Sequence, residues 1–236
     1  MKLIRRLLLL IITVILIAGG ILAYKGYKIY KEVLEKTSVA DKVAEIKAKE
    51  NYTELKDMPE FYKNAVIAVE DRRFYEHGPI DLIAITRAVF VNIKSWELQE
   101  GGSTITQQLA KNIYFTQEKS ALRKVAELFM AYEIEKNCDK DTILELYLNT
   151  SYFGDGYYCV KDASEGYYGK EPKEMNRNEA SMLAGIPNAP SAYCPTKHLG
   201  LAKQRQIQVL DKMVKYKVIT EQDKTDILQE DNSVEK

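Results

Sequence analysis

An unbroken apolar run over residues 7–24 is the first strong pattern in the chain. It approaches the roughly 20 residues that a helix needs to cross a bilayer. Lys2, Arg5 and Arg6 precede it, and positive residues mark the cytoplasmic side of a membrane helix. We therefore expect a single transmembrane anchor, with residues 1–6 in the cytoplasm and everything after the anchor outside. A cleaved signal peptide is the alternative, but the run is longer than a usual signal core and offers no persuasive small-residue cleavage site.

The rest of the chain divides into three regions by composition. Residues 25–57 are rich in Lys, Glu and Tyr, with a few apolar residues at loose helical spacing. We expect a stalk or short helices here, which join the anchor to a globular domain over residues 58–218. The charged residues 219–236 are expected to form a frayed C-terminal tail, as chain ends often do.

Apolar residues at helical spacing dominate the globular domain. Residues 61–69 are apolar on nearly every face, which predicts a buried helix. A Thr142-x-x-Glu145 sequence predicts a capping box at the start of another helix. The Tyr-rich stretch over residues 152–168, interrupted by glycines, is expected to be a loop. Helices are also predicted over residues 81–92, 141–149, 178–185 and 201–218.

A further helix is predicted after Gly101-Gly102, opened by a Ser/Thr cap. One of its faces is apolar and is expected to pack on the core: Ile105, Leu109 and Ile113. Another face carries neutral hydrogen-bonding groups and a single cation at positions i, i+3, i+4 and i+7: Thr104, Gln107, Gln108 and Lys111. A solvated helix face normally carries Lys and Glu, so this polar stripe is typical of a surface that binds a ligand.

The next predicted helix carries a charged triplet. Arg123 and Lys124 stand one turn before Glu127, a spacing at which side chains meet. A pair of ordinary surface salt bridges is one interpretation, and such pairs contribute little stability. The apolar positions of this helix predict a core face made of Leu122, Val125, Phe129 and Tyr132.

A second charged cluster, Glu70-Asp-Arg-Arg-Phe-Tyr-Glu-His77, ends the predicted buried helix. Carboxylates that emerge from a buried apolar helix lose hydration and need partners. Arg72 and Arg73 could neutralise Glu70 and Asp71 in a purely structural cluster. Otherwise the arrangement is typical of a catalytic acid or base.

Composition narrows the functional classes. The 236 residues are 46% hydrophobic, enough for a full core, and 34 basic residues balance 34 acidic ones. Without a basic excess, nucleic acid is not an expected partner, and an anion site must come from a local cluster such as Lys111 to Lys124. Three cysteines without a Cys-x-x-Cys pair, and two histidines, argue against a Cys/His metal centre. Cys159 and Cys194 lie outside the membrane, where a disulfide can persist, and isolated buried thiols are the alternative.

The charged clusters and the polar stripe lie in segments that follow one another in a specific order. These segments are Glu70-Asp-Arg-Arg-Phe-Tyr-Glu-His77, Gly101-Gly-Ser-Thr-Ile-Thr-Gln-Gln-Leu-Ala-Lys-Asn112, Arg123-Lys-Val-Ala-Glu127, Ile143-Leu-Glu-Leu-Tyr-Leu-Asn-Thr-Ser-Tyr-Phe-Gly154 and Glu179-Ala-Ser-Met-Leu-Ala-Gly-Ile-Pro-Asn-Ala-Pro-Ser191. In this order they resemble the motifs of the peptidoglycan glycosyltransferases, the family of the glycosyltransferase domain of class A penicillin-binding proteins and of the monofunctional enzymes. The resemblance covers roughly residues 58 to 218.

Two positions depart from the family's pattern. Members usually have His-x-Gly-Ile-Asp after the first motif, whereas this chain has His77-Gly-Pro-Ile-Asp81, so the turn there is expected to differ in detail. Many members carry an arginine where this chain has Lys119, which keeps the charge but loses the bidentate guanidinium. Phosphate contact is expected to survive with altered geometry.

The resemblance implies a mainly α, lysozyme-like helical domain with a small membrane-proximal lobe, preceded by the transmembrane helix. It implies polymerisation of lipid II into β-1,4 glycan strands, with inversion at the anomeric carbon and release of undecaprenyl pyrophosphate. Glu70 matches the family's general base, and Glu127 matches its second essential carboxylate. The same matching assigns substrate binding to Asp71, Phe74, His77, Ser103, Thr104, Gln107, Gln108, Lys111, Lys119, Arg123, Lys124 and Asn149.

Cofactor, partners and location follow from the same resemblance. A divalent cation such as Mg²⁺ often accompanies the donor pyrophosphate in this family, but the sequence itself requires no cofactor and shows no dedicated metal cage. Expected partners are lipid II, the growing glycan chain, the membrane bilayer and other cell-wall synthesis proteins. The expected location is the bacterial cell membrane, with the catalytic domain outside the cytoplasm.

Two other functions stay open at this point. A lysozyme-like lytic glycosidase also uses two carboxylates, although cutting a sugar–sugar bond offers no pyrophosphate for the cations to neutralise. An inactive membrane-anchored glycan-binding protein would not need Glu70 and Glu127. A transpeptidase is not expected, because Ser233-Val-Glu-Lys236 is the Ser-x-x-Lys of this sequence and no domain follows it.

Overall fold

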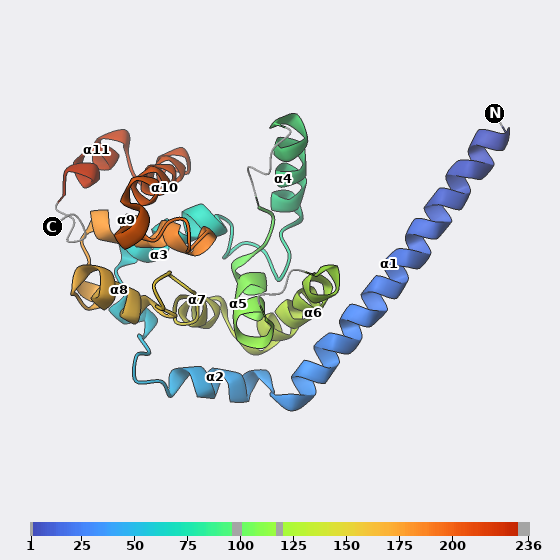
Figure 1. Cartoon of the computed structure of the whole chain (residues 1–236), viewed down its shortest axis with the longest axis horizontal. Coiled ribbons are helices and arrows are strands. Elements are labelled where there is room, and N and C mark those ends of the chain that lie inside the picture. Colours follow the sequence, from blue (N-terminus) through green and yellow to red (C-terminus); the bar gives the residue numbers. More distant parts are fainter. Residues whose placement is uncertain (1, 96–100, 117–119, 231–236) are drawn as a thin grey trace.

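The computed structural model describes residues 2–95, 101–116 and 120–230. Every regular element in these residues is a helix, which confirms the expected mainly α fold and is consistent with a lysozyme-like helical domain. One helix projects from the helical body and another stands up from it (Figure 1). The elements are α1 (Lys2–Lys36), α2 (Val39–Lys47), η1 (Leu55–Asp57), α3 (Glu60–Glu70), α4 (Leu82–Ser95), α5 (Ile105–Tyr114), α6 (Ala121–Asn137), α7 (Lys140–Leu148), α8 (Val160–Tyr168), η2 (Pro172–Glu174), α9 (Arg177–Gly185), η3 (Ile186–Asn188), α10 (Pro195–Lys215) and α11 (Glu221–Gln229).

A hydrophobic core joins the helices of the body. α3 packs against α9 and α10, and α5 packs against α6 and α7. Burying a large apolar side chain contributes about 1.5–3 kcal/mol, so these contacts dominate the stability of the body. The predicted helix over residues 61–69 is confirmed as the buried helix α3. Side chains with almost no exposed surface come from several helices: Tyr62, Leu109, Met130, Tyr147, Leu183 and Val209.

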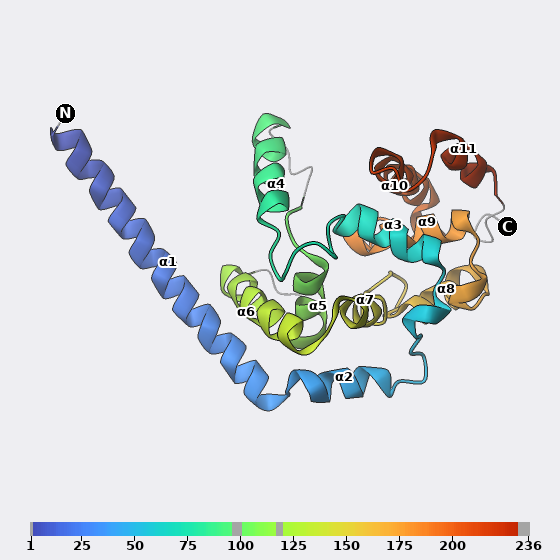
Figure 2. The same ribbon diagram turned by 180° about the vertical axis from the view of Figure 1, so that it is seen from behind.

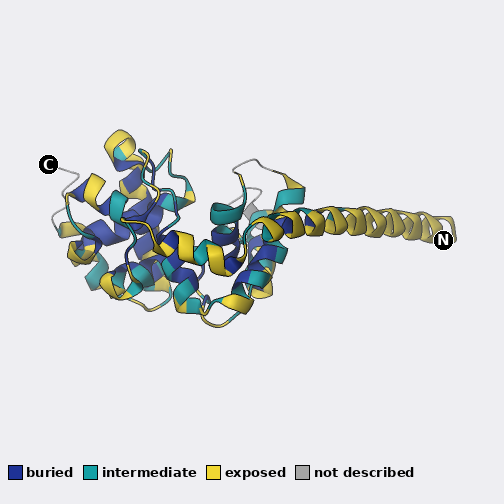
Figure 3. Ribbon diagram, turned by 90° about the horizontal axis from the view of Figure 1, so that it is seen from below, coloured by how far each residue is buried: buried dark blue, intermediate teal, exposed yellow. Residues whose placement is uncertain are grey.

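α1 is a continuous helix that contains the whole predicted span over residues 7–24. Its most apolar 18-residue window has a mean hydropathy of 2.8, and none of that window is buried. The helix is exposed along most of its length (Figure 3). By length and composition it is able to cross a membrane.

The expected stalk over residues 25–57 packs against the globular body. Tyr30, Val39 and Ile46 are buried and belong to the same core cluster as the body helices. α2 begins at the cap Ser38, whose side chain accepts a hydrogen bond from the amide of Asp41. In the view from behind, α2 runs beneath α6 and α7 (Figure 2). The segment after the anchor is therefore folded onto the domain.

The predicted capping box at Thr142 is wrong. α7 begins at Lys140, and the side chain of Asp139 caps it by accepting a hydrogen bond from the amide of Thr142 at 2.8 Å. Glu145 has a different partner, because its carboxylate accepts a hydrogen bond from the amide of Leu55 at 2.7 Å. This carboxylate therefore ties η1 to α7.

Two segments are more helical than expected. The Tyr-rich stretch over residues 152–168 contains α8, which ends at Gly169 with a φ of 66°, a left-handed conformation that glycine adopts without strain. The expected frayed tail contains α11, whose Ile227 is fully buried. In both places buried contacts that the sequence pattern did not reveal outweighed the local charge and glycine content.

The predicted core face of α6 is also wrong. Tyr132 is 55% exposed, and the side chains that reach the core are instead Ala126, Met130 and Ile134. The larger apolar residues on the other face meet α1: the Phe129 ring lies 5.4 Å from that of Tyr27 and 5.9 Å from that of Tyr30, between centroids. α6 therefore has two covered faces, one on the core and one on α1.

α4 presents an apolar face that is exposed in the described part of the chain. It stands up from the body, on the side toward which the N-terminal part of α1 also extends (Figure 1). Large apolar side chains on it are more than half exposed: Leu82, Ile83, Val89, Phe90 and Ile93. An exposed apolar patch of this size marks a binding surface rather than a solvated one.

The three cysteines are free thiols, so the considered disulfide does not form. Cys159 caps α8, where its sulfur accepts a hydrogen bond from the amide of Asp162 at 3.4 Å. Burial raises the pKa of the Cys159 thiol to about 11, so it stays protonated and unreactive at neutral pH. The Cys194 sulfur lies 3.0 Å from a carboxylate oxygen of Asp155.

Candidate functional site

A cleft of about 400 Å³ lies between α3, α5, α6 and α10. Its lining is polar and rich in charge, which suits a ligand with phosphate or sugar groups better than an apolar one. Most of the residues singled out in the sequence contribute to it: Glu70, Asp71, Ser103, Thr104, Gln107, Gln108, Lys111, Lys124 and Glu127.

Glu70 is the last residue of α3 and lines this cleft, and its two carboxylate oxygens have different environments. Its Oε2 accepts a hydrogen bond from Nε2 of Gln108 at 2.8 Å. The Tyr147 hydroxyl donates to Oε1 of Gln108 at 3.2 Å, which fixes the orientation of the amide. The other oxygen of Glu70, Oε1, is buried without a hydrogen-bond partner. A carboxylate that accepts a hydrogen bond on one oxygen and none on the other is suited to accept a proton from a ligand.

Arg205 on α10 forms an ion pair with Glu70, and the sequence reasoning missed it. Its guanidinium lies 3.8 Å from Oε1 of Glu70. Arg205 donates to the carbonyl of Gly185 at 3.3 Å and to Gln208 at 3.1 Å, and it lies over the Tyr193 ring. Arg72 and Arg73 do not take this role: Arg72 stacks on Tyr216, and Arg73 pairs with Asp81.

Gly185 provides the space that the stem of Arg205 occupies. A Cβ at residue 185 would lie 2.8 Å from Cγ of Arg205 and 3.3 Å from a methyl group of Val209. We expect Gly185→Ala to lower the free energy of unfolding by about 1–3 kcal/mol, because it overpacks a buried contact. Urea denaturation measures this change.

The matched control is Gly200→Ala, at a position with no atom within 4 Å of the added methyl group. We expect it to leave stability unchanged or to raise it slightly, because alanine favours a helix. Equal stability of the Gly185→Ala and Gly200→Ala proteins would contradict the tight fit of Arg205 against Gly185.

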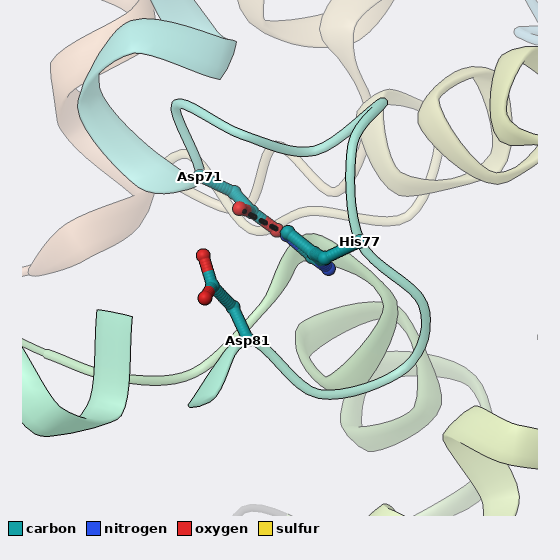
Figure 4. Close-up of side chains that lie close together, drawn as sticks. All are labelled: Asp71, His77 and Asp81. Atoms are coloured by element: carbon teal, nitrogen blue, oxygen red, sulfur yellow. Dashed lines mark hydrogen bonds and ion pairs between the residues drawn. The ribbon is translucent and has the colours of Figure 1, made fainter. Parts of the chain in front are cut away.

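Asp71, His77 and Asp81 form a compact cluster beside the cleft (Figure 4). Nε2 of His77 lies 2.7 Å from Oδ1 of Asp71, and the amide of Ile105 donates to the other oxygen of Asp71 at 3.0 Å. Burial raises the pKa of Asp71, although these two hydrogen bonds oppose the shift. Burial also acts on Asp81, but hydrogen bonds from Arg73 and the amide of Ala84 hold its pKa at about 2.

This cluster does not fit a divalent cation. A guanidinium donates two hydrogen bonds, at 2.6 and 3.1 Å, to the carboxylate of Asp81. Both nitrogens of His77 are already engaged, one by Asp71 and one by the carbonyl of Gly78 at 2.6 Å. A cation cage needs oxygen ligands that are free to turn toward the ion. The cluster instead braces the loop between α3 and α4 against the start of α5.

Glu127 is buried and forms ion pairs, so the interpretation as ordinary surface salt bridges does not hold. It is 1% exposed, pairs with Arg123 through one oxygen, and lies 3.1 Å from the amine of Lys124 through the other. Nε of Arg123 is buried and has no hydrogen-bond partner. Glu127 therefore holds two cations in place while part of their hydrogen-bonding capacity stays unused.

Lys111 and Lys124 bring positive charge to the same end of the cleft. Lys124 donates to the hydroxyl of Ser103 at 2.8 Å, which connects α6 to the segment before α5. Burial lowers the pKa of Lys111; the charge of Glu127 opposes this shift, and the nearby charges of Arg123 and Lys124 add to it. Repulsion among grouped cations is relieved when an anion binds, so this end of the cleft is suited to a phosphate group.

Thr104 and Gln107 lie in the cleft but have protein partners. A Ser/Thr cap was predicted for this helix, and the residue that caps α5 is Thr104, whose hydroxyl also donates to the carbonyl of Pro79 at 3.0 Å. Nε2 of Gln107 donates to the same carbonyl at 3.1 Å. Pro79 is where this chain departs from the family's usual glycine, so the two side chains hold the departing turn in position.

The side chains of three other residues assigned to substrate binding contact other parts of the protein. Phe74 is fully buried beneath the amine of Lys140, and His77 supports Asp71. Asn149 is buried and exchanges two hydrogen bonds of 2.8 Å with the backbone of Thr53. Lys119 lies outside the described residues.

The sequence reasoning also missed cleft residues beyond its motifs. Lys212 and Tyr216, at the end of α10, line the cleft. The amine of Lys212 donates to the carbonyl of Val69 at 3.0 Å, next to Glu70. In the sequence, the basic residues of α10 lie on an amphipathic helix. This is the usual pattern of a solvated face, so it did not indicate a cleft.

The chain was compared with protein families, with characterised proteins and with solved structures. The transglycosylase family profile matches residues 37–214. Penicillin-binding protein 1A of Neisseria lactamica is 46% identical over 180 residues, which cover 76% of this chain and 23% of that protein. Penicillin-binding protein 1A of Aquifex aeolicus is 44% identical over 169 residues, which cover 72% of this chain and 23% of that protein. The chain thus spans less than a quarter of these relatives' length.

A solved structure of penicillin-binding protein 1A from Haemophilus influenzae shares 30% sequence identity with the chain. The alignment covers 54% of this chain and 16% of that one, with a TM-score of 0.38. This score is too low to indicate a shared fold by itself.

Proposed function

The chain belongs to the transglycosylase family, and we propose that it is a peptidoglycan glycosyltransferase that polymerises lipid II into β-1,4 glycan strands. The observation that carries the proposal is that one cleft holds both a buried carboxylate, one oxygen of which has no hydrogen-bond partner, and a group of cations. The carboxylate is suited to activate an acceptor hydroxyl, and the cations are suited to a pyrophosphate leaving group. The lytic glycosidase and the inactive glycan-binding protein are not favoured.

Glu70 acts as the general base in this proposal. The sugar 4-hydroxyl of the acceptor loses its proton to the Glu70 carboxylate while its oxygen attacks the anomeric carbon of the growing chain. The bond between that carbon and the pyrophosphate oxygen breaks at the same time. Attack from the side opposite the leaving group converts the α-linked donor into a β-linked product. The hydrogen bond from Gln108 and the charge of Arg205 keep the carboxylate oriented.

The leaving group is a lipid pyrophosphate, which needs no proton but gains charge as the bond breaks. Fixed cations stabilise this charge more effectively than water, because they are already oriented before the reaction. In this proposal Lys111 and Lys124, which line the cleft, stabilise it together with Arg123, which pairs with the cleft residue Glu127. A divalent cation would therefore come with the pyrophosphate rather than from a protein cage.

The test is the stoichiometry of the products. The full chain in detergent, supplied with labelled lipid II, should release one undecaprenyl pyrophosphate for each disaccharide added to the polymer. Consumption of lipid II without release of the lipid pyrophosphate would contradict the proposal.

The same proposal assigns roles to the apolar surfaces. Both substrates carry polyprenyl tails, so an enzyme confined to the membrane meets them more often than one in solution. α1 would be the anchor, with residues 1–6 in the cytoplasm and the domain outside the cell membrane. The exposed apolar face of α4 would enter the same leaflet from the domain side.

The α4 surface can be tested without the anchor. A chain that begins at residue 25 keeps the part of α1 that packs on the body, and it should still bind liposomes. Replacing both Ile83 and Val89 with glutamate should reduce this binding at least tenfold, because two charges would enter an apolar layer. Cosedimentation with vesicles measures the change, and unaltered binding by the double variant would remove α4 from this role.

A further inference from the structure

The transmembrane helix does more than hold the protein at the membrane. We propose that its continuation beyond the bilayer is part of the active-site scaffold, and that Gly26 is a positioning residue for the cations on α6. This inference rests on the proposed glycosyltransferase function.

α1 and α6 approach each other closely at Gly26. A Cβ at residue 26 would lie 2.5 Å from Cγ1 of Val125, 2.7 Å from its Cβ and 3.3 Å from the backbone nitrogen of Ala126. Ordinary van der Waals contact requires 3.4–4 Å. Only a residue without a side chain allows this approach. Gly26 is buried, whereas nearly all the apolar residues earlier in α1 are exposed.

The contact continues along both helices in the same direction. Four residues after Gly26, the Tyr30 hydroxyl donates to a carboxylate oxygen of Glu133 at 3.1 Å. Between these contacts, the rings of Tyr27 and Tyr30 pack on Phe129. Burial and the Glu133 carboxylate raise the pKa of Tyr30 to about 12. The docked part of α1 thus begins two residues after the predicted membrane span ends.

α6 lies between this contact and the cleft. Val125 and Glu127 are two residues apart, which places them roughly 200° apart around the helix. Val125 faces Gly26, while Glu127 faces Arg123 and the cleft. The position of α1 on one side of α6 therefore determines how far the charged triplet reaches into the cleft on the other side.

A side chain at residue 26 would force the two helices apart. Rotation of Val125 can move its Cγ1, but its Cβ is fixed to the backbone, so at least one helix has to shift by about 1 Å. Displacements of this size at reacting groups can reduce a rate by about 100-fold. Because the cations act on charge that develops in the transition state, the loss is expected in kcat more than in KM.

The experiment compares two alanine substitutions on the same helix in the full-length protein. Gly26→Ala is expected to lower kcat for lipid II polymerisation at least tenfold, with a much smaller change in KM. Gly20→Ala adds the same methyl group where no atom lies within 4 Å, and it should leave kcat unchanged. Adding Val125→Gly to Gly26→Ala removes the two closest atoms, so it should restore most of the lost activity relative to Val125→Gly alone.

Hydrogen exchange gives a second readout that does not depend on catalysis. Gly26→Ala should accelerate exchange of the α6 amides, over residues 121–137, and Gly20→Ala should not. If the wild-type chain lacked polymerase activity, the proposed function would fail while the exchange data still tested the docking. Wild-type kcat and exchange in Gly26→Ala, or equal losses in both alanine variants, would overturn the inference.

Discussion

Replacing Glu70 with glutamine is expected to reduce kcat for lipid II polymerisation by about 10²–10⁴-fold, the usual contribution of a general base. Glutamine has nearly the same shape and can keep one hydrogen bond to Gln108, but its amide cannot accept the proton of the acceptor hydroxyl. The effect should appear in kcat, because binding of the two substrates depends on other groups in the cleft. Steady-state polymerisation with labelled lipid II measures it.

A neighbouring glutamate on the same helix supplies the control. Glu60 begins α3, and its side chain is 76% exposed and pairs with Lys63. Glu60→Gln should leave kcat unchanged, since an exposed pair of this kind contributes little. If Glu70→Gln and Glu60→Gln polymerised lipid II equally well, Glu70 would not be the base.

The second large effect is expected at Glu127. Glu127→Gln removes the charge that holds Arg123 and Lys124, and we expect kcat to fall by about 10²–10³-fold, comparable to the loss of a donor that stabilises developing charge. The two cations would then turn toward solvent rather than toward the pyrophosphate. The same polymerisation assay measures the change.

A double-mutant cycle separates this indirect role from direct contact with the sugar. If Glu127 acts by holding Arg123, then Arg123→Ala and Glu127→Gln remove one shared interaction, and the double variant should lose little more activity than the worse single variant. Fully additive losses would show that Glu127 acts independently of Arg123. Thermal melting of each variant identifies any loss that comes from unfolding, because removing one member of a buried pair is destabilising.

Much of the fold was predictable because its signals are local. The apolar run over residues 7–24, the buried helix α3 and the Thr104 cap each depend on residues within a few positions of one another. Glu70, Lys111 and Glu127 were found from ordered motifs that match a family, and the structure places all three in one cleft.

The remainder depends on contacts between distant segments. Arg205 reaches Glu70 from α10, and Asn149 binds the backbone of Thr53, so neither role is visible in the neighbouring sequence. The core face of α6 was misjudged because its largest apolar residues pack on α1, while small residues such as Ala126 face the core. A periodicity shows which side of a helix is apolar, but not which of two partners covers it.

The most direct test of the central claim is gel analysis of the products that the wild-type chain makes from labelled lipid II. If the chain is a glycosyltransferase, the gel will show a ladder of glycan strands that lengthen with time, and preformed peptidoglycan will release no soluble fragments. Fragments released from preformed peptidoglycan, with no ladder from lipid II, would contradict the account and assign the two carboxylates to glycan cleavage.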